Sequence, residues 1–161
     1  EMTAGSLGMG LSAACGIAYG ARLLKRDFYT YVLLGDGECN EGQVWEAAMT
    51  ASNYKLSNLI AFVDKNGMQN DGFTHDIIDM GDLKNKFDAF GFFAQEVDGH
   101  DIMQIIKAID NAKGQSEKPS MIICNTIKGK GISYMEHNIR FHGGRPTEKE
   151  YDIAMNELKK G

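Results

Sequence analysis

Short apolar runs alternate with amphipathic segments along the chain, and this alternation constrains the fold more than any other feature. Four runs are nearly continuous in apolar residues, as expected for strands buried on both faces, and they cover residues 28–34, 58–64, 92–97 and 120–126. Helical segments lie before, between and after them, at residues 6–25, 43–53, 83–89, 102–113 and 147–158. Strands joined by helices form parallel sheets, so the sequence predicts an α/β fold: a mostly parallel sheet with helices on both faces.

Two of the predicted helices carry recognisable start signals. Asp101 is expected to cap the helix over residues 102–113. Thr147 and Glu150 have the spacing of a capping box at the last helix. The 102–113 helix also has a clear apolar period, formed by Ile102, Ile105, Ile106 and Ile109.

Length, charge and cysteine usage exclude several classes of protein. The 161 residues suit one domain, and we expect a single domain over residues 1–161 that is incomplete at its N-terminus, because no element starts at Glu1-Met2-Thr3. A net charge of −5 without a basic stripe argues against a nucleic-acid partner. No apolar run approaches the roughly 20 residues that cross a membrane. Three widely spaced cysteines argue against disulfides or a thiolate zinc site and favour the reducing cytoplasm.

Polar residues follow the first two predicted strands directly. Asp36 lies between two glycines after the first strand, and Asn66 follows the second strand 30 positions later. Ligands bind beyond the carboxyl ends of parallel strands, and carboxylate and amide oxygens suit a hard cation such as Mg²⁺ or Ca²⁺. The pair supplies one negative charge, so a diphosphate-bearing cofactor is expected to complete the charge balance. The alternative is that Asp36 is only a turn residue or helix cap.

Ordered motifs resemble the transketolase family. Its thiamine diphosphate signature is matched by Gly35-Asp36-Gly37-Glu38, Glu41-Gly42, Trp45-Glu46-Ala47 and Asp64-Lys65-Asn66. Residues 5–12 resemble its preceding glycine-rich segment, and residues 126–131 and 141–143 resemble its later motifs. The resemblance covers nearly the whole chain in order. The Lys-Gly-Lys-Gly form at residues 128–131 and the ending near residue 161 are similar to separately encoded N-terminal subunits of split transketolases.

The resemblance implies two cofactors, thiamine diphosphate and Mg²⁺ (or Ca²⁺). It implies that Asp36, Asn66 and the backbone carbonyl of Met68 bind the metal. The other cofactor contacts that it implies are the backbone of Gly37 at the diphosphate, main-chain groups of Gly5 and Leu7 at the aminopyrimidine, Lys128 at the thiazolium, and His142 near the diphosphate and the reacting centre. Met9 departs from the glutamine that is common at its position in the family.

Three residues are implied to take part in catalysis: His142, Glu41 and Glu46. The two glutamates would lie at a dimer interface, in an acidic network that couples two active sites and titrates as a unit. Without the resemblance, a solvated helix face accounts for both glutamates, and a packed or capping role accounts for His142. Gly143 and Gly144 beside this histidine leave room for a ligand.

The implied activity is that of a transketolase, which transfers a two-carbon ketol unit from a ketose phosphate to an aldose phosphate in the pentose phosphate pathway. The glutamate that activates the cofactor would lie in a separate pyrimidine-binding domain or C-terminal subunit, and the family's upstream, substrate-facing histidines are missing here. We therefore expect the isolated chain to be inactive, and to work with such a partner as a dimer or heterotetramer.

Two alternatives remain at this point. The same signature serves other thiamine diphosphate enzymes, such as 1-deoxyxylulose-5-phosphate synthase and the thiamine-dependent dehydrogenases. A different class is a non-catalytic α/β module that binds a metal or a nucleotide. Its nicotinamide-binding version is disfavoured, because residues 5–10 do not form a GxGxxG motif after a strand.

Overall fold

A computed structural model describes residues 2–3 and 5–159 of the chain. Residues 1, 4, 160 and 161, at the ends of the predicted domain, lie outside this description. The elements follow one another in this order: α1 (Met9–Leu23), β1 (Thr30–Gly35), η1 (Gly37–Asn40), α2 (Gly42–Asn53), β2 (Leu59–Lys65), β3 (Met68–Gln69), β4 (Gly72–Phe73), α3 (Thr74–Ile77), α4 (Leu83–Ala89), β5 (Phe93–Asp98), α5 (Ile102–Lys113), β6 (Ser120–Asn125), η2 (Ile139–His142) and α6 (Glu148–Leu158).

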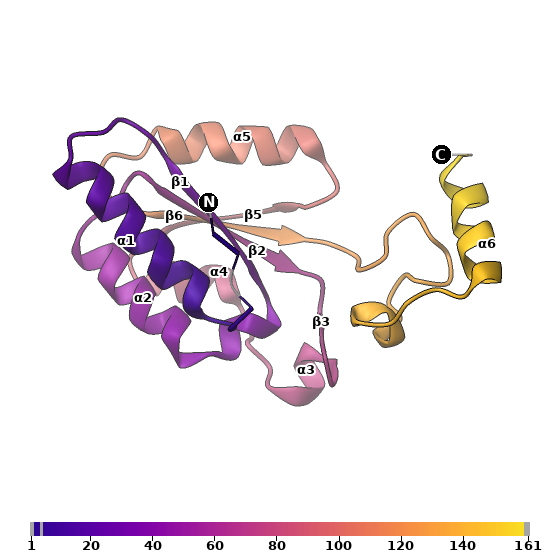
Figure 1. The fold of residues 1–161 in the computed structure, drawn as a ribbon. Coiled ribbons are helices and arrows are strands. Elements are labelled where there is room, and N and C mark those ends of the chain that lie inside the picture. The colour runs from indigo at the N-terminus through magenta and orange to yellow at the C-terminus, as the bar shows by residue number, and fades with distance from the viewer. Residues whose placement is uncertain (1, 4, 160–161) are drawn as a thin grey trace.

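The central feature is a four-stranded sheet in the order β1-β2-β6-β5, in which every neighbouring pair is parallel. Helices lie on both of its faces (Figure 1), so the predicted fold class is confirmed. Gly35 at the end of β1 pairs with Asp64 of β2, and Asp64 pairs with Cys124 of β6. Since these strands run in the same direction, their carboxyl ends meet at one edge of the sheet.

The two faces of the sheet are covered unequally. One face packs against α1, α2 and α4, and its core contains fully buried side chains such as Leu11, Val44 and Phe87. The other face carries α5 alone, over a smaller cluster that includes Ile60, Ala108 and Ile122. Tyr31 and Leu33 of β1 are 50% and 69% exposed, so the β1 side of the sheet remains open.

Helix α5 is present as predicted, but only part of its apolar face is buried. Asp101 caps it as predicted, by accepting the backbone N–H groups of Met103 and Gln104. Of the four isoleucines predicted to form its apolar face, however, Ile102 and Ile106 are 66% and 45% exposed. Ala108 and Ala112 are the buried side chains of this helix, because it lies over β5 and β6 rather than across the whole sheet.

Most boundaries differ from the predicted ones by one or two residues, and the two largest differences lie at the start of α1 and after β2. Helix α1 begins at Met9 rather than near residue 6. The preceding residue, Gly8, has left-handed backbone torsions (φ +84°), so the helix cannot extend further toward the N-terminus. The segment from Asn66 to Gly81, where no strand or helix was predicted, contains the β3–β4 hairpin and the short helix α3. None of the helices in residues 2–3 and 5–159 is both long and apolar enough to cross a membrane.

The chain after β6 leaves the sheet and forms a small unit of its own, which we call the C-terminal segment (residues 126–159). It contains η2 and α6, which stand apart from the sheet in Figure 1. The predicted capping box is present: the Thr147 hydroxyl accepts the N–H of Glu150, while the Glu150 carboxylate accepts the N–H of Thr147.

Candidate functional site

Asp36 lies where β1 ends, beside the end of β2, and it is 4% exposed. Its Oδ1 accepts the N–H of Gly37 (2.9 Å) and its Oδ2 accepts the N–H of Gly67 (2.7 Å). The first contact makes Asp36 the cap of η1, as the turn-residue alternative expected. The second contact holds the segment of residues 66–68 against Asp36. We call Asp36 together with Asn66, Gly67 and Met68 the strand-end corner.

The amide of Asn66 is held in one orientation by its neighbours. Its Nδ2 donates to Asp64 (3.1 Å), and its Oδ1 accepts the N–H of Met68 (3.0 Å). The other oxygen of Asp64 accepts the hydroxyl of Thr126, which follows β6. Asp64 therefore joins the ends of β2 and β6 while orienting Asn66. Asp64 and Thr126 both belong to motifs that resemble the family, but the bond between them was not predicted from the sequence.

Burial dominates the electrostatics of Asp36. Loss of hydration raises the pKa of its carboxyl above the ordinary value of 3.8, and the nearby Asp64 carboxylate adds to this increase, whereas the N–H groups of Gly67 and Gly37 oppose it. A buried carboxylate of this kind is stabilised in its ionised form by a cation. The described residues contain no group of three or more His, Cys, Asp or Glu side chains that could hold a metal. A cation at this corner would therefore rely on one carboxylate, the Asn66 amide and backbone carbonyls, and these oxygen donors suit Mg²⁺ or Ca²⁺.

Gly37 is packed too closely to tolerate a side chain. A Cβ at this position would lie 2.7 Å from the Cβ of Gln69 and 3.2 Å from its Oε1. Gln69 in turn accepts a hydrogen bond from Asn40 (3.2 Å), which ties η1 to β3. The close approach of η1 to β3 thus depends on the absence of a side chain at Gly37.

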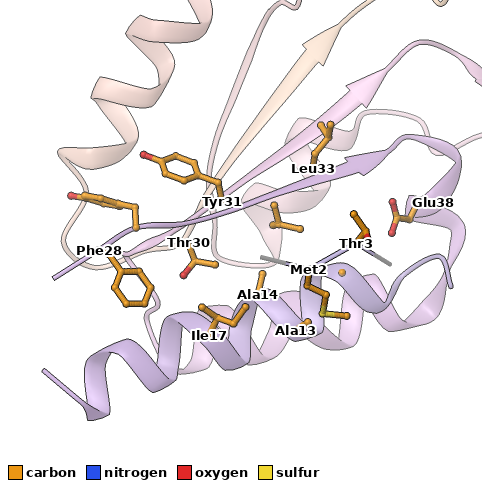
Figure 2. A pocket seen from close by; sticks show the side chains of 13 residues that line it. Met2, Thr3, Ala13, Ala14, Ile17, Phe28, Thr30, Tyr31, Leu33 and Glu38 are labelled. Atoms are coloured by element: carbon orange, nitrogen blue, oxygen red, sulfur yellow. The ribbon is translucent and has the colours of Figure 1, made fainter. Parts of the chain in front are cut away.

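The segment before α1 brings Gly5 and Leu7 to the surface. Both are exposed, with Leu7 at 58%. Gly8, which follows them, is buried and donates its N–H to Glu38 of η1 (2.9 Å). A groove of about 660 Å³ lies between α1 and β1 (Figure 2) and is lined by Ile17, Thr30 and Glu38 among others. This groove does not include the strand-end corner, so the two features are separate.

Glu41 and Glu46 are both exposed on α2, and Glu41 is the N-cap residue of that helix. No contact in the described part of the chain links either carboxylate to Asp36. Their exposure agrees with a solvated helix face, and it leaves both side chains accessible to a partner.

The remaining predicted residues lie in the C-terminal segment. Lys128 is half-buried in the loop after β6, and His142 is exposed at the end of η2. Helix η2 lies against β3, the strand that carries Met68. His100 is exposed, and its Nε2 accepts the N–H of Ile127 (2.8 Å). This contact ties the turn after β5 to the loop that carries Lys128.

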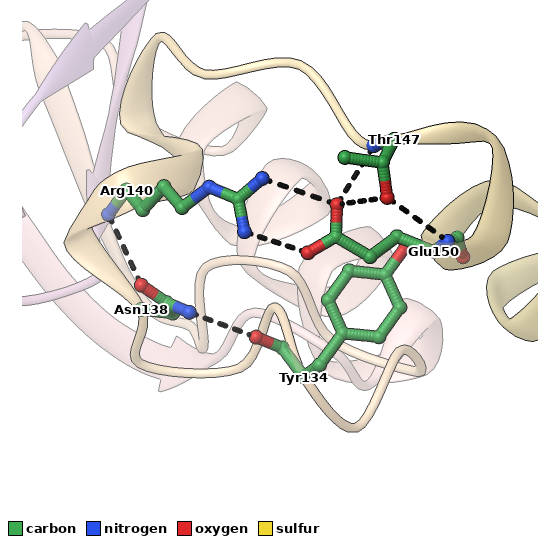
Figure 3. Close-up of polar contacts among 5 residues, drawn as sticks. All are labelled: Tyr134, Asn138, Arg140, Thr147 and Glu150. Carbon is green, nitrogen blue, oxygen red and sulfur yellow. Dashed lines mark hydrogen bonds and ion pairs between the residues drawn. The ribbon is translucent and has the colours of Figure 1, made fainter.

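Side-chain pairs hold the C-terminal segment together (Figure 3). Arg140 forms two ionic hydrogen bonds with Glu150 (2.6 and 3.1 Å), and Tyr134 donates its hydroxyl to the Glu150 carbonyl (2.7 Å). The bond from Arg140, followed by those from Thr147, lowers the pKa of Glu150 to about 2. Asn138 caps η2 and donates to the carbonyl of Tyr134 (3.0 Å).

Comparison with known proteins gives consistent matches. A family model described as "Transketolase, thiamine diphosphate binding domain" matches residues 1–160. The chain is 46% identical over 160 residues to the 6-deoxy-6-sulfo-D-fructose transketolase subunit SqwG of Clostridium sp. (strain MSTE9), a match that covers 99% of this chain and 58% of that protein. It is 40% identical over 158 residues to an apulose-4-phosphate transketolase subunit of Phocaeicola vulgatus (98% and 56%).

Among solved structures, a transketolase from Campylobacter jejuni superimposes with a TM-score of 0.88 at 32% identity, covering 95% of this chain and 25% of that one. The chain thus spans a little over half the length of the two curated subunits that it matches, at 58% and 56%.

Proposed function

The chain belongs to the transketolase family, as a thiamine diphosphate-binding domain, and from this premise we propose that it forms the metal- and diphosphate-binding part of a transketolase active site. The observation that carries the proposal is the strand-end corner. There a buried carboxylate and the Asn66–Met68 turn are held together by the Asp36–Gly67 hydrogen bond of 2.7 Å.

Three residues would hold the metal. Asp36 supplies a carboxylate, Asn66 an amide oxygen and Met68 its backbone carbonyl. These hard oxygen donors suit Mg²⁺, with Ca²⁺ as the alternative. The metal would offset the cost of keeping the buried Asp36 carboxylate ionised, and that cost is visible as the raised pKa of this group.

The rest of the chain would bind and orient the cofactor. We propose that the backbone of Gly37 contacts the diphosphate and that the main chain of Gly5 and Leu7 contacts the aminopyrimidine. Lys128 would lie near the thiazolium ring, and His142 near the diphosphate and the reacting centre. When bound, thiamine diphosphate supplies a carbon nucleophile, and the residues of this chain would hold the cofactor in place.

The proposed reaction moves a two-carbon ketol unit from a ketose phosphate to an aldose phosphate. We propose that a C-terminal subunit or domain supplies the activating glutamate, because the two relatives from Clostridium and Phocaeicola are themselves named as subunits. Glu41 and Glu46, both exposed, would then be covered in an acidic interface between two active sites. The assembly would be a dimer or heterotetramer in the cytoplasm.

The test is an assay for ketol transfer with Mg²⁺ and thiamine diphosphate, on the chain alone and together with its C-terminal partner. We expect activity only in the mixture. Donors should include common ketose phosphates, 6-deoxy-6-sulfofructose and apulose 4-phosphate, the last two because relatives are named for them. Turnover by the isolated chain would contradict the need for a partner. A preference for pyruvate would favour a different thiamine diphosphate enzyme.

A further inference from the structure

Glu38 connects two segments of the molecule that are far apart in sequence. Its Oε1 accepts the N–H of Gly8 (2.9 Å), the residue before α1, and its Oε2 accepts the N–H of Gly35 (3.1 Å), the last residue of β1. Both oxygens of one carboxylate are thus used, each on a different element. Glu38 itself is half-buried at the start of η1 and lies at one end of the groove in Figure 2.

Each of the two N–H groups needs a partner that the secondary structure does not supply. Gly8 lies at the N-terminus of α1, where backbone N–H groups have no carbonyl partner within the helix. The N–H of Asp36 points toward β2 and donates to Asp64 (3.2 Å). Because successive residues of a strand direct their N–H groups to opposite sides, the N–H of Gly35 points to the open edge of β1. A carboxylate near the N-terminus of α1 also interacts favourably with the helix dipole.

The backbone at Gly8 is closely packed against the start of α2. Its φ is +84°, and a Cβ built on it would lie 2.9 Å from the Cβ of Glu41 at the start of α2. Glu38 therefore ties a tightly packed backbone, directly after residues 5–7, to the turn that carries Asp36. Within the described residues, no other side-chain hydrogen bond links Gly8 to this turn.

From this geometry we infer that Glu38 is a positioning residue that fixes the spacing between residues 5–7 and the strand-end corner. The inference rests on the proposed function, in which residues 5–7 contact one end of the cofactor and the corner binds its diphosphate end. Glu38 touches neither end. Glu38 favours cofactor binding indirectly, because a single ligand that spans two loops binds well only when the loops are already at the right separation.

The test compares a ligand that needs both loops with one that needs only the corner. Thiamine diphosphate with Mg²⁺ is the first probe, and pyrophosphate with Mg²⁺ is the second. Trp45 is the only tryptophan of the chain, and its indole N–H donates to the carbonyl of Cys39 (2.9 Å), the residue after Glu38, so its fluorescence reports on this turn. Both probes are titrated into the wild-type chain and into Glu38→Ala, Glu38→Gln and the control Glu148→Gln, an exposed position on α6.

We expect Glu38→Ala to weaken thiamine diphosphate binding by at least about tenfold, in the range found for residues that orient a binding group, while pyrophosphate binding is unchanged. Glu38→Gln keeps one acceptor oxygen and should lie between Glu38→Ala and the wild type. The control should match the wild type for both probes. Melting temperatures measured without ligand separate this effect from general destabilisation.

Other results would overturn the inference. Equal loss of both affinities would make Glu38 a purely structural residue, and no loss would give it no role in binding. A wild-type chain that binds thiamine diphosphate but not pyrophosphate would contradict the assignment of the diphosphate end to the strand-end corner alone. A wild-type chain that binds neither probe would refute the proposed function itself, and the inference would fall with it.

Discussion

The strand-end corner and the C-terminal segment are both held by hydrogen bonds, but in different ways. At the corner, Asp36 is 4% exposed and accepts N–H groups from two loops that parallel strands bring together. In the C-terminal segment, the pairing of Arg140 with Glu150 lies near the surface, where the arginine side chain is 52% exposed. The corner is therefore shaped by the sheet, whereas the segment depends on its own side chains.

This difference separates the effects of mutation. Changes at the corner should alter ligand binding strongly, because a buried polar group has few alternative partners. Changes in the C-terminal segment should loosen that segment alone, because exposed ion pairs contribute little to global stability and are screened by salt. Variants in the two regions therefore test whether the corner governs ligand binding and the C-terminal segment only its own stability.

The largest expected effect is that of Asp36→Asn on cofactor binding. Removing the only carboxylate of the proposed metal site should weaken Mg²⁺-dependent thiamine diphosphate binding by more than about 100-fold, since residues that merely orient a ligand already account for 10–100-fold. In a thermal melt, saturating cofactor should raise the melting temperature of the wild type and of the exposed control Asp27→Asn, but not that of Asp36→Asn. An equal rise in all three would exclude Asp36 from the site.

Metal binding should also depend on pH. Because burial raises the pKa of Asp36 above 3.8, its carboxyl takes up a proton at a higher pH than an exposed aspartate does. The ionised form binds the metal, so affinity should fall on acidification and recover as the pH rises.

The next effect is a loss of stability in Gly37→Ala. The new Cβ would lie 2.7 Å from the Cβ of Gln69, so η1 or β3 must move, and overpacking of this kind costs about 1–3 kcal/mol. Gly16→Ala in α1 is the matched control, because nothing lies within 4 Å of its Cβ position, and it should stabilise by up to about 1 kcal/mol. Urea unfolding measures both; unchanged stability in Gly37→Ala would mean that the close packing is absent.

A smaller and local effect is expected for Thr147→Ala. The variant loses the hydroxyl of the capping box, which should destabilise α6 by about 1 kcal/mol. Amide hydrogen exchange should accelerate in α6 and stay unchanged in β1 and β2, whereas Thr147→Ser should retain most of the protection. Faster exchange throughout the sheet would show that the C-terminal segment is not an independent unit.

The smallest effect concerns the acid sensitivity of α6. The pKa of Glu150 is lowered from 4.5 to about 2, so its carboxylate stabilises the folded segment above pH 4.5, and this contribution is lost as the pH falls toward 2. Exchange protection in α6 of the wild type should therefore decrease over that range. Glu150→Gln should show weaker protection at neutral pH and a flatter profile. Identical profiles would contradict a role for the Arg140–Glu150 pair.

The four strands of the parallel sheet, the five longer helices and the meeting of Asp36 with residues 66–68 could be predicted from the sequence. Nearly continuous apolar runs and helical periods leave few alternatives to a parallel sheet, and parallel strands necessarily end at one edge. The capping residues Asp101 and Thr147 were also predictable, because capping depends on side chains near in sequence.

The long-range polar contacts could not be predicted in the same way. Glu38 binds backbone N–H groups, which carry no residue-type signal, at Gly8 and Gly35. Asp64 and Thr126 lie 62 positions apart, and only the pairing of β2 with β6 brings them together. The burial of α5 could not be predicted for a related reason: its period marks an apolar face but not how much of the sheet lies beneath that face.

Calorimetric titration of thiamine diphosphate into the purified chain, with and without Mg²⁺, shows most directly whether the strand-end corner binds this cofactor through a metal. We predict saturable binding in Mg²⁺ that disappears when the metal is chelated and in Asp36→Ala. Binding of thiamine diphosphate that is indifferent to the metal, or binding of NAD with no metal requirement, would contradict it.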